Sequence, residues 1–164
     1  MQKSFVAIGD LHLHLDDQRL KVFGDFWEYF KTIHQQDEPV IFLGDIFDKS
    51  LMSGWVIDYF IEKIHELDEC PIYILQGNHD YSKQFRSIVK PLARFKNVTL
   101  LEDKIELMIL GNKCLFLPYR YTAKEDYANV DGTFDYIFSH ITDPADQFSE
   151  EGIEIKAKGK KIYG

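Results

Sequence analysis

The chain has few cysteines and few basic residues, and each shortage excludes a class of protein. Of its 164 residues only Cys70 and Cys114 are cysteines, and they form no C-x-x-C pair, so neither a disulfide framework nor a zinc-thiolate site is expected. Lys and Arg total 19 against 27 Asp and Glu, which gives a formal net charge of -8. This charge argues against binding polyanions through the overall field of the protein. Bound metal ions attract phosphate locally, so the acidic charge does not exclude nucleic acid.

The sequence also lacks membrane and linker signals. No segment approaches the length of an apolar membrane span, and the N-terminal residues run into a strand pattern without the apolar stretch of a signal peptide. We therefore expect a cytoplasmic protein with reduced, buried cysteines. No repeat or linker rich in Pro, Gly or Ser divides the chain, so we predict one domain over residues 1–164.

The first half of the chain alternates short apolar runs with amphipathic helical patterns. Apolar runs at residues 5–8, 40–43 and 72–75 each end at a Gly or polar residue, as buried parallel strands do. Between them, residues 18–35 and 52–67 place apolar side chains at three- and four-residue spacing. This order predicts an α/β fold with a parallel sheet, right-handed crossovers and helices packed on the sheet.

The second half predicts one more helix followed mostly by strands. We expect the helix over residues 82–95, with Ser82 as its N-cap and Pro91 as a kink or an early end. A tight turn is expected at Gly111-Asn112 and a short helix within residues 121–129. Strand patterns occupy residues 98–101, 104–110, 113–117, 135–138, 152–155 and 160–164.

Four short polar clusters directly follow apolar runs. They are Asp10-Leu11-His12, Gly44-Asp45-Ile46-Phe47-Asp48, Gly77-Asn78-His79-Asp80 and Ser139-His140. Ligands of open α/β sheets bind beyond the carboxyl ends of the strands, so these clusters should meet at one edge. Their oxygen and nitrogen donors suit manganese, iron or zinc, and Asp45 is a candidate bridge between two ions. Gly44 and Gly77 allow tight turns that bring the side chains back over the strand ends.

Each of these positions also has a purely structural explanation. Asp and Asn favour turns after strands, which would account for Asp10, Asp45 and Asn78 one at a time. His140 would be a hydrogen-bonded core histidine. Turn chemistry alone does not explain why all the clusters follow strands, so we favour a dinuclear metal site.

In order and spacing, the clusters resemble the calcineurin-like metallophosphoesterase family. Its pattern is D-x-H, G-D-x-x-D, G-N-H-D or G-N-H-E, a lone His, and G-H-x-H. Asp10 with His12, residues 44–48, residues 77–80 and His140 match the first four motifs. The resemblance covers almost the whole chain and implies a two-layer β core flanked by helices, an αββα sandwich.

The resemblance also implies how the ligands divide between two ions. Asp10, His12 and Asp45 would hold one metal, and Asp45, Asn78 and His140 would hold the other. The implied cofactors are two divalent ions, manganese first, with iron, zinc and magnesium as alternatives. The implied chemistry is in-line attack on phosphorus by a metal-bridged hydroxide, with both ions stabilising the developing charge.

Two residues of the third cluster are implied to be catalytic. His79 would protonate or stabilise the leaving oxygen. Asp80 would orient His79 through a hydrogen bond, as a carboxylate does for other catalytic imidazoles.

The similarity further points to a class of substrate. Protein phosphatases of the family usually carry an Arg soon after the second cluster, and Asp48-Lys49-Ser50 offers none. The chain is most similar to SbcD-type recombination and repair nucleases, including phage versions, at residues 44–48, 77–80, 95–98 and 117–119. That similarity implies a nuclease that cleaves DNA with two manganese ions and works with a coiled-coil ATPase partner.

Three basic residues are candidates for contact with a nucleic acid. Lys83 and Arg86 continue at helical spacing to Lys90 and Arg94, which would form a basic stripe along a phosphate backbone, although a solvated helix face has the same pattern. Arg120 is a candidate phosphate contact, with an exposed surface arginine as the alternative.

The last motif of the family, G-H-x-H, does not follow His140. We interpret Gly164 as the first residue of that motif and the chain as a C-terminally truncated domain that lacks the last strands of the fold. One alternative function is a small-molecule nucleotide phosphoesterase. The other is a catalytically impaired fragment that acts as a binding module.

Overall fold

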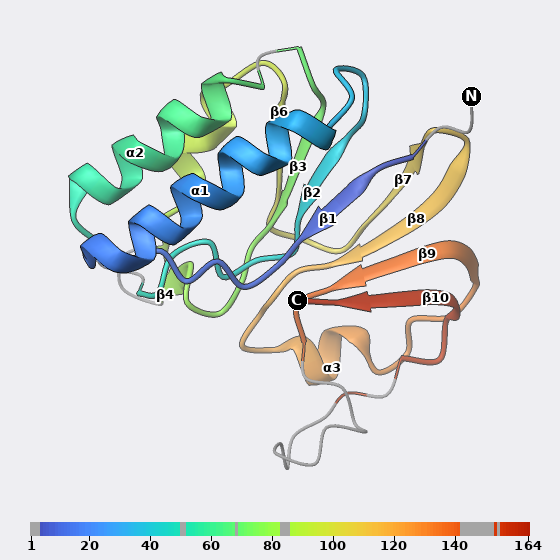
Figure 1. Ribbon diagram of the computed structural model, residues 1–164. Helices are drawn as coiled ribbons and strands as arrows, with labels where there is room; N and C mark the ends of the chain where they lie inside the picture. Colours follow the sequence, from blue (N-terminus) through green and yellow to red (C-terminus); the bar gives the residue numbers. More distant parts are fainter. Residues whose placement is uncertain (1–3, 50–51, 68, 83–85, 142–152, 154) are drawn as a thin grey trace.

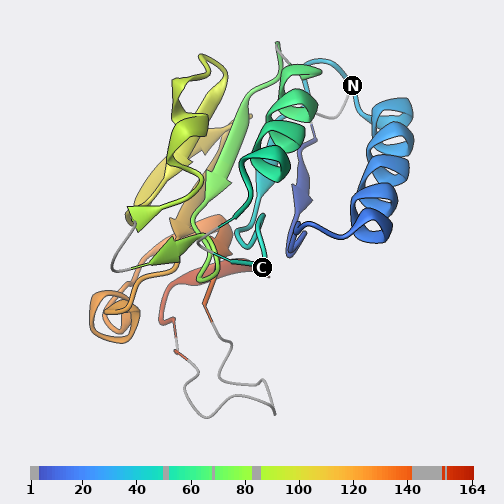
Figure 2. The same cartoon turned by 90° about the vertical axis from the view of Figure 1, so that its left-hand side faces the viewer.

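Two four-stranded β-sheets pack face to face with helices on their outer sides (Figure 1). The computed structural model describes residues 4–49, 52–67, 69–82, 86–141, 153 and 155–164. Figure 2 shows the layers from the side. The arrangement is the predicted αββα sandwich, so the expected fold class is confirmed.

The first sheet is entirely parallel, with strand order β1-β2-β3-β6. Its strands are β1 (Val6–Ile8), β2 (Val40–Phe42), β3 (Ile72–Leu75) and β6 (Val98–Leu101). Strands buried on both faces are apolar at almost every position, which is why these segments read as continuous apolar runs. The parallel register directs the carboxyl ends of all these strands to the same edge.

Two helices cover the outer face of this sheet, α1 (Asp17–Ile33) and α2 (Gly54–His65). The Asp16 side chain caps α1 by accepting a hydrogen bond of 2.8 Å from the backbone N–H of Gln18. Apolar residues at three- and four-residue spacing face the sheet, and Trp27 of α1 is fully buried there. No helix in the described part of the chain is long and apolar enough to cross a membrane.

The second sheet is mixed, with strand order β10-β9-β8-β7. A hairpin joins β7 (Ile105–Ile109) to β8 (Asn112–Leu117), and β9 (Thr133–Ser139) and β10 (Lys158–Tyr163) add in parallel. The short helix α3 (Ala123–Tyr127) packs on the outer face, where the Tyr127 hydroxyl donates to the carbonyl of Pro118 at 2.7 Å.

Apolar side chains from both sheets meet between the layers. This inner core contains Ile41, Leu43, Leu75, Leu101, Ile109, Cys114, Phe116 and Phe138. Cys114 and Cys70 are both free and buried, as predicted. Burial raises the pKa of each thiol to about 11, so both remain protonated at neutral pH.

The helix predicted over residues 82–95 is wrong. The segment forms a small antiparallel hairpin, β4 (Tyr81–Ser82) with β5 (Arg86–Ser87), and then a 3-10 helix, η1 (Lys90–Arg94). The backbone N–H of Ile88 donates to the carbonyl of Asp80 at 2.8 Å and fixes this reversal. Pro91 has no N–H to continue an α-helical ladder. The basic residues of this segment therefore do not form a helical stripe.

Two smaller predictions also change. The turn between β7 and β8 lies one residue earlier than expected, at Leu110 and Gly111, whose φ angles are 52° and 85°. Two successive positive φ angles match the twist of a tight hairpin. The strand expected at 152–155 falls partly outside the described residues, and neither Ile153 nor Ile155 belongs to a strand.

Candidate metal centre

The four polar clusters converge at the carboxyl ends of β1, β2, β3 and β9, as predicted. The first two loops run side by side, because the backbone N–H of His12 donates to the carbonyl of Asp45 at 2.9 Å. The next residue, Leu13, donates to Ile46 in the same way at 2.8 Å and pairs with Phe47. These backbone bonds place the first cluster directly against the second.

The backbone of the site lies in the left-handed region at three non-glycine residues. The φ angles are 51° at Asp10, 44° at His12 and 48° at Asp45. Such conformations cost on the order of 1 kcal/mol or more each, and they persist where surrounding contacts impose them. In the described part of the chain, the remaining non-glycine residue with positive φ is Leu110, in the hairpin turn.

Two glycines let the clusters approach one another. Gly44 has a φ of 100°, and a Cβ there would lie 2.5 Å from Nδ1 of His140. A Cβ on Gly77 would overlap the backbone N and the carboxylate of Asp45. Gly44 therefore permits the predicted turn through its positive φ. Gly77 is needed because the loops of the second and third clusters touch at that point.

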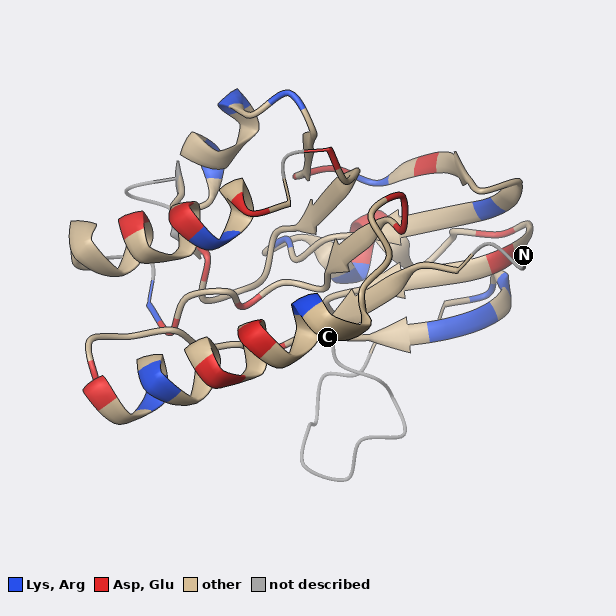
Figure 3. Ribbon diagram, turned by 45° about the horizontal axis from the view of Figure 1, so that its top comes forward, with Lys and Arg blue, Asp and Glu red and all other residues tan. Residues whose placement is uncertain are grey.

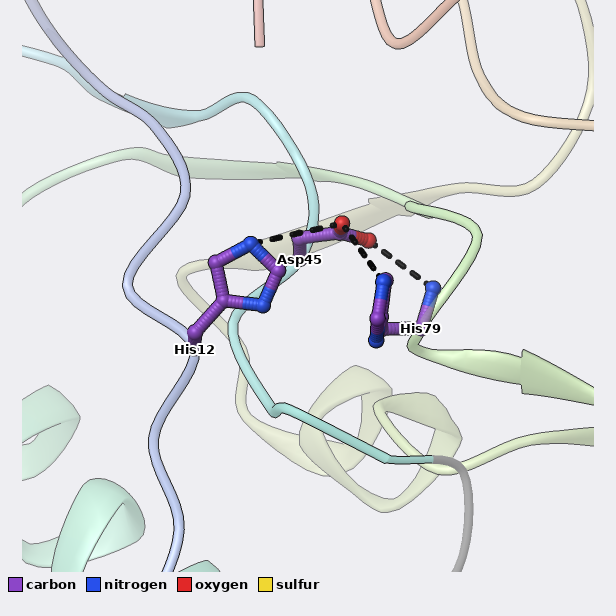
Figure 4. Close-up of side chains that lie close together, drawn as sticks. All are labelled: His12, Asp45 and His79. Carbon is purple, nitrogen blue, oxygen red and sulfur yellow. Dashed lines mark hydrogen bonds and ion pairs between the residues drawn. The ribbon is translucent and has the colours of Figure 1, made fainter.

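The Asp45 carboxylate is the centre of the site (Figure 4). It is 4% exposed, and Oδ1 accepts a 2.9 Å hydrogen bond from the backbone N–H of His79. Its oxygens lie 3.7 Å from Nε2 of His12, 3.9 Å from Nε2 of His79 and 3.3 Å from Nε2 of His140. Asp45 belongs to both groups of ligand atoms that lie within 4.8 Å of one another, one with His12 and His79 and one with Asp10 and His140.

The imidazole of His140 is held in one orientation. Its Nδ1–H donates to the carbonyl of Leu43 at 2.8 Å. Nε2 then faces two oxygens, Oδ1 of Asn78 at 2.8 Å and Oδ1 of Asp45 at 3.3 Å. These three atoms, one nitrogen and two oxygens, all carry lone pairs, so they require a proton or a metal ion between them.

The charge states of this pair follow from burial and proximity. Burial alone would lower the pKa of His140, but its hydrogen bond and attraction to Asp45 give a net rise. Burial would raise the pKa of Asp45, but His140, together with His79, brings it below its ordinary value. Each of the two groups therefore favours the charged form of the other.

The donors present fit divalent metal ions. They combine carboxylate and amide oxygens with imidazole nitrogens, the mixture that manganese, iron and zinc accept. The structure brings together the predicted set of Asp45, Asn78 and His140. Among the other ligand atoms, Asp10 lies in a group with His140 and His12 in a group with His79, and the division of the ligands between two ions stays a prediction.

Asp80 does not orient His79, and this prediction is wrong. The carboxylate of Asp80 is fully buried and accepts from backbone N–H groups, 3.1 Å from Phe47 and Gly77 and 3.4 Å from Ile46. It therefore ties the second cluster to the third. Burial raises the pKa of Asp80 to about 6, and the backbone donors limit the rise.

The partner of His79 is instead a backbone group. Nδ1–H of His79 donates a hydrogen bond of 2.6 Å to the carbonyl oxygen of Asp48. The Asp48 side chain lies 3.7 Å from Nδ1 of His12. Because a carbonyl is common to every residue type, no signal in the sequence identifies this contact.

A cavity of about 640 Å³ opens beside the metal ligands. It is lined by Asp10, His12, Asp45, Asn78, Tyr119, Arg120, Tyr121, Ala123, Lys124, His140, Ile141, Ile153, Tyr163 and Gly164. The backbone N–H of Gly164 donates to the carbonyl of Ser139 at 3.0 Å, which fixes Gly164 at the end of β10 beside the site.

The predicted nucleic-acid contacts have different outcomes. Arg120 lines the cavity, but it pairs with Asp103 and, at 3.2 Å, with Asp126, so its charge is already compensated. Lys83 and the side chain of Arg86 lie outside the described part of the structure. In Figure 3 the basic residues of β10 lie away from its C-terminal end, and Lys158, Lys160 and Lys161 do not line the cavity.

Comparison with known proteins yields one family match. The family model described as calcineurin-like phosphoesterase matches residues 3–158, a range that contains all four clusters. No curated protein matches the chain significantly. Among solved structures, the chain is similar to the protein of unknown function AQ665 from Aquifex aeolicus, with 14% sequence identity and a TM-score of 0.46. That alignment covers 98% of this chain and 91% of the other.

Proposed function

The chain belongs to the calcineurin-like phosphoesterase family, whose members hydrolyse phosphoesters with metal ions, and on this premise we propose that it is a nuclease. Its proposed substrate is DNA, and its proposed reaction is phosphodiester hydrolysis. The observation that carries the proposal is the position of Asp45, whose carboxylate is shared by two groups of metal-ligand atoms. A shared carboxylate is what a two-metal phosphoesterase needs.

The proposed ligands are Asp10, His12, Asp45, Asn78 and His140, and the proposed ions are two manganese ions. When bound, divalent ions stabilise the negative charge that develops on the phosphoryl oxygens. The protein holds the ligands ready through its backbone, because the His12 and Asp45 loops are bonded together. His140 keeps Nε2 directed at the site through its bond to Leu43.

His79 is the proposed proton donor to the leaving oxygen. Its Nδ1 is occupied by the carbonyl of Asp48, so Nε2 is the nitrogen left to exchange a proton with a substrate. The Asp45 carboxylate lies 3.9 Å from this Nε2. The ring is about 40% exposed, which leaves it accessible to a substrate.

The choice of DNA rests on the sequence. The second cluster is followed by Lys49 and Ser50 rather than by the Arg usual in protein phosphatases. The similarity to SbcD-type nucleases supports both a DNA substrate and a coiled-coil ATPase as the proposed partner. A small-molecule nucleotide phosphoesterase is the alternative that the experiment must separate.

Hydrolysis assays with and without manganese test the proposal. We expect manganese-dependent hydrolysis of both single-stranded DNA and bis(p-nitrophenyl) phosphate. Asp45→Ala should lower both activities by about 100-fold or more, since removal of a shared ligand disturbs both ions. Asp58→Ala, an exposed carboxylate on α2, is the matched control and should retain both activities.

The outcomes separate the alternatives. Hydrolysis of the small ester without hydrolysis of DNA would contradict the nuclease and favour a small-molecule phosphoesterase. Calorimetry with manganese tests the binding-module alternative. Absence of metal binding at millimolar manganese would overturn the two-metal enzyme altogether.

A further inference from the structure

The cavity beside the metal centre has an aromatic wall, formed by Tyr119 and Tyr121, and the ring of Tyr81 packs against Tyr121 without lining the cavity. The ring of Tyr121 lies 5.6 Å from that of Tyr119 at 72°, and 5.6 Å from that of Tyr81 at 57°. The Tyr121 side chain is nevertheless 52% exposed. Tyr119 and Tyr121 line the same cavity as Asp45 and Asn78. A large ring surface is thus presented to solvent beside the candidate metal ligands.

This wall is fixed to the loop that carries the third cluster. The backbone N–H of Tyr119 donates to the carbonyl of Gln76 at 2.8 Å. The side-chain amide of Gln76 donates back to the carbonyl of Tyr119 at 3.3 Å. Gln76 is 4% exposed and directly precedes Gly77-Asn78. These hydrogen bonds tie the segment of Tyr119 to the loop that carries the ligand Asn78.

Two basic residues, Arg120 and Lys124, lie beside the tyrosines in the lining of the cavity. Arg120 pairs with Asp103, before β7, and with Asp126 of α3. It therefore anchors the tyrosine segment on both sides. Lys124 of α3 also lines the cavity and is exposed. The cavity thus offers aromatic surface and a cation on one side and metal ligands on the other.

We propose that Tyr121 is a stacking platform for the nucleobase that adjoins the scissile phosphate of a single-stranded nucleic acid. Every base has a π face that stacks on an aromatic ring, and such stacking tolerates any sequence. A base within a duplex is already stacked on its neighbours, so the platform selects an unpaired strand. The cavity volume of about 640 Å³ is within the usual range for a small ligand and suits one nucleotide unit.

This inference rests on the proposed function and names the form of its substrate. The test therefore uses substrates that share one phosphodiester and differ in their bases. They are the dinucleotide TpT and two analogues in which a tetrahydrofuran residue replaces either thymidine. With manganese, we expect the loss of one of the two bases to lower kcat/KM by about tenfold.

Variants of Tyr121 connect that preference to the ring. Tyr121→Ala should lower kcat/KM for TpT by about tenfold and remove the difference between TpT and the sensitive analogue. Tyr121→Phe should keep the preference because it keeps the ring. Tyr29→Ala is the matched control, since Tyr29 is 63% exposed on α1 and does not line the cavity. An unchanged preference in Tyr121→Ala would overturn the inference.

A binding measurement distinguishes this inference from the proposed function. A single strand that carries a fluorescent purine analogue should be quenched by the wild-type protein and by Tyr121→Phe, but not by Tyr121→Ala. If no substrate is hydrolysed and quenching still depends on the ring, the hydrolase proposal fails and the stacking site stands. If hydrolysis proceeds and quenching ignores Tyr121, the stacking site fails alone.

Discussion

The two walls of the cavity are built in opposite ways. On the metal side, Asp10, His12 and Asp45 have left-handed backbone conformations, and a buried Asp80 fixes the loops. On the tyrosine side, two hydrogen bonds between Gln76 and Tyr119 hold the backbone, and the Tyr121 side chain is 52% exposed. Strain and burial are concentrated where reacting groups must be positioned, and exposed rings occur where a variable ligand must be accommodated.

This difference implies that substitutions on the metal side cost stability, whereas those on the tyrosine side cost substrate recognition. A buried contact between loops has no room to relax, because protein interiors are closely packed. An exposed ring or ion pair is surrounded partly by water, which replaces what is removed. The next three predictions test that contrast, from the largest expected effect to the smallest.

Gly77→Ala should have the largest effect. The new Cβ would overlap the backbone N and the carboxylate of Asp45. Because the obstacles are backbone and a buried side chain, we expect a loss of about 4 kcal/mol of unfolding free energy, above the usual cost of overpacking. Urea denaturation measures this loss, and calorimetry should show weakened manganese binding.

Gly54→Ala is the matched control for this substitution. A Cβ on Gly54, the first residue of α2, would meet nothing within 4 Å. Alanine also favours helix, so the variant should be as stable as the wild type or slightly more stable. Equal stability of the Gly77 and Gly54 variants would contradict the close approach of the two loops.

Asp80 should give the protein a characteristic pH dependence. Its pKa is raised to about 6 from an ordinary value of 3.8, so the native state binds this proton more tightly than the unfolded chain. The contribution of Asp80 is therefore fully present below pH 4 and is lost as the pH rises from about 4 to about 6, by roughly 3 kcal/mol. Metal-free protein in urea at several pH values measures it.

Asp80→Asn isolates this contribution from those of the other titrating groups. Asparagine does not titrate, so the difference in unfolding free energy between wild type and variant should change across pH 4 to 6. Asn also places an N–H₂ group against the backbone donors of the neighbouring loops. A constant difference across that range would show that Asp80 does not titrate as proposed here.

The convergence of the clusters could be predicted because it depends on strand order alone. Once β1, β2 and β3 are parallel neighbours, their carboxyl ends share an edge, and residues just beyond them must meet. The apolar runs that predict these strands are buried on both faces and leave little ambiguity. The positions of Asp10, Asp45 and Asn78 follow from this arrangement.

The grouping of the ligand atoms and the partner of His79 could not be predicted. The grouping of the ligand atoms depends on left-handed backbone angles at Asp10, His12 and Asp45, which Asp and His adopt more often than most residues but which residue type does not dictate. The His79 contact uses the backbone carbonyl of Asp48. In residues 82–95, spacing alone favoured a helix, but the bond from Ile88 to the carbonyl of Asp80 closes a hairpin instead.

Arg120→Ala should have the smallest effect on stability. The side chain is 40% exposed, as is typical of surface ion pairs, and its partners Asp103 and Asp126 are also exposed. We expect a loss of about 0.5 kcal/mol in urea denaturation. Lys104→Ala, the neighbouring exposed cation, is the control and should cost less. Arg120→Ala should also retain hydrolysis of bis(p-nitrophenyl) phosphate, because Arg120 holds the tyrosine wall and not the metal ligands. A loss as large as that of Gly77→Ala would erase the contrast between the two walls.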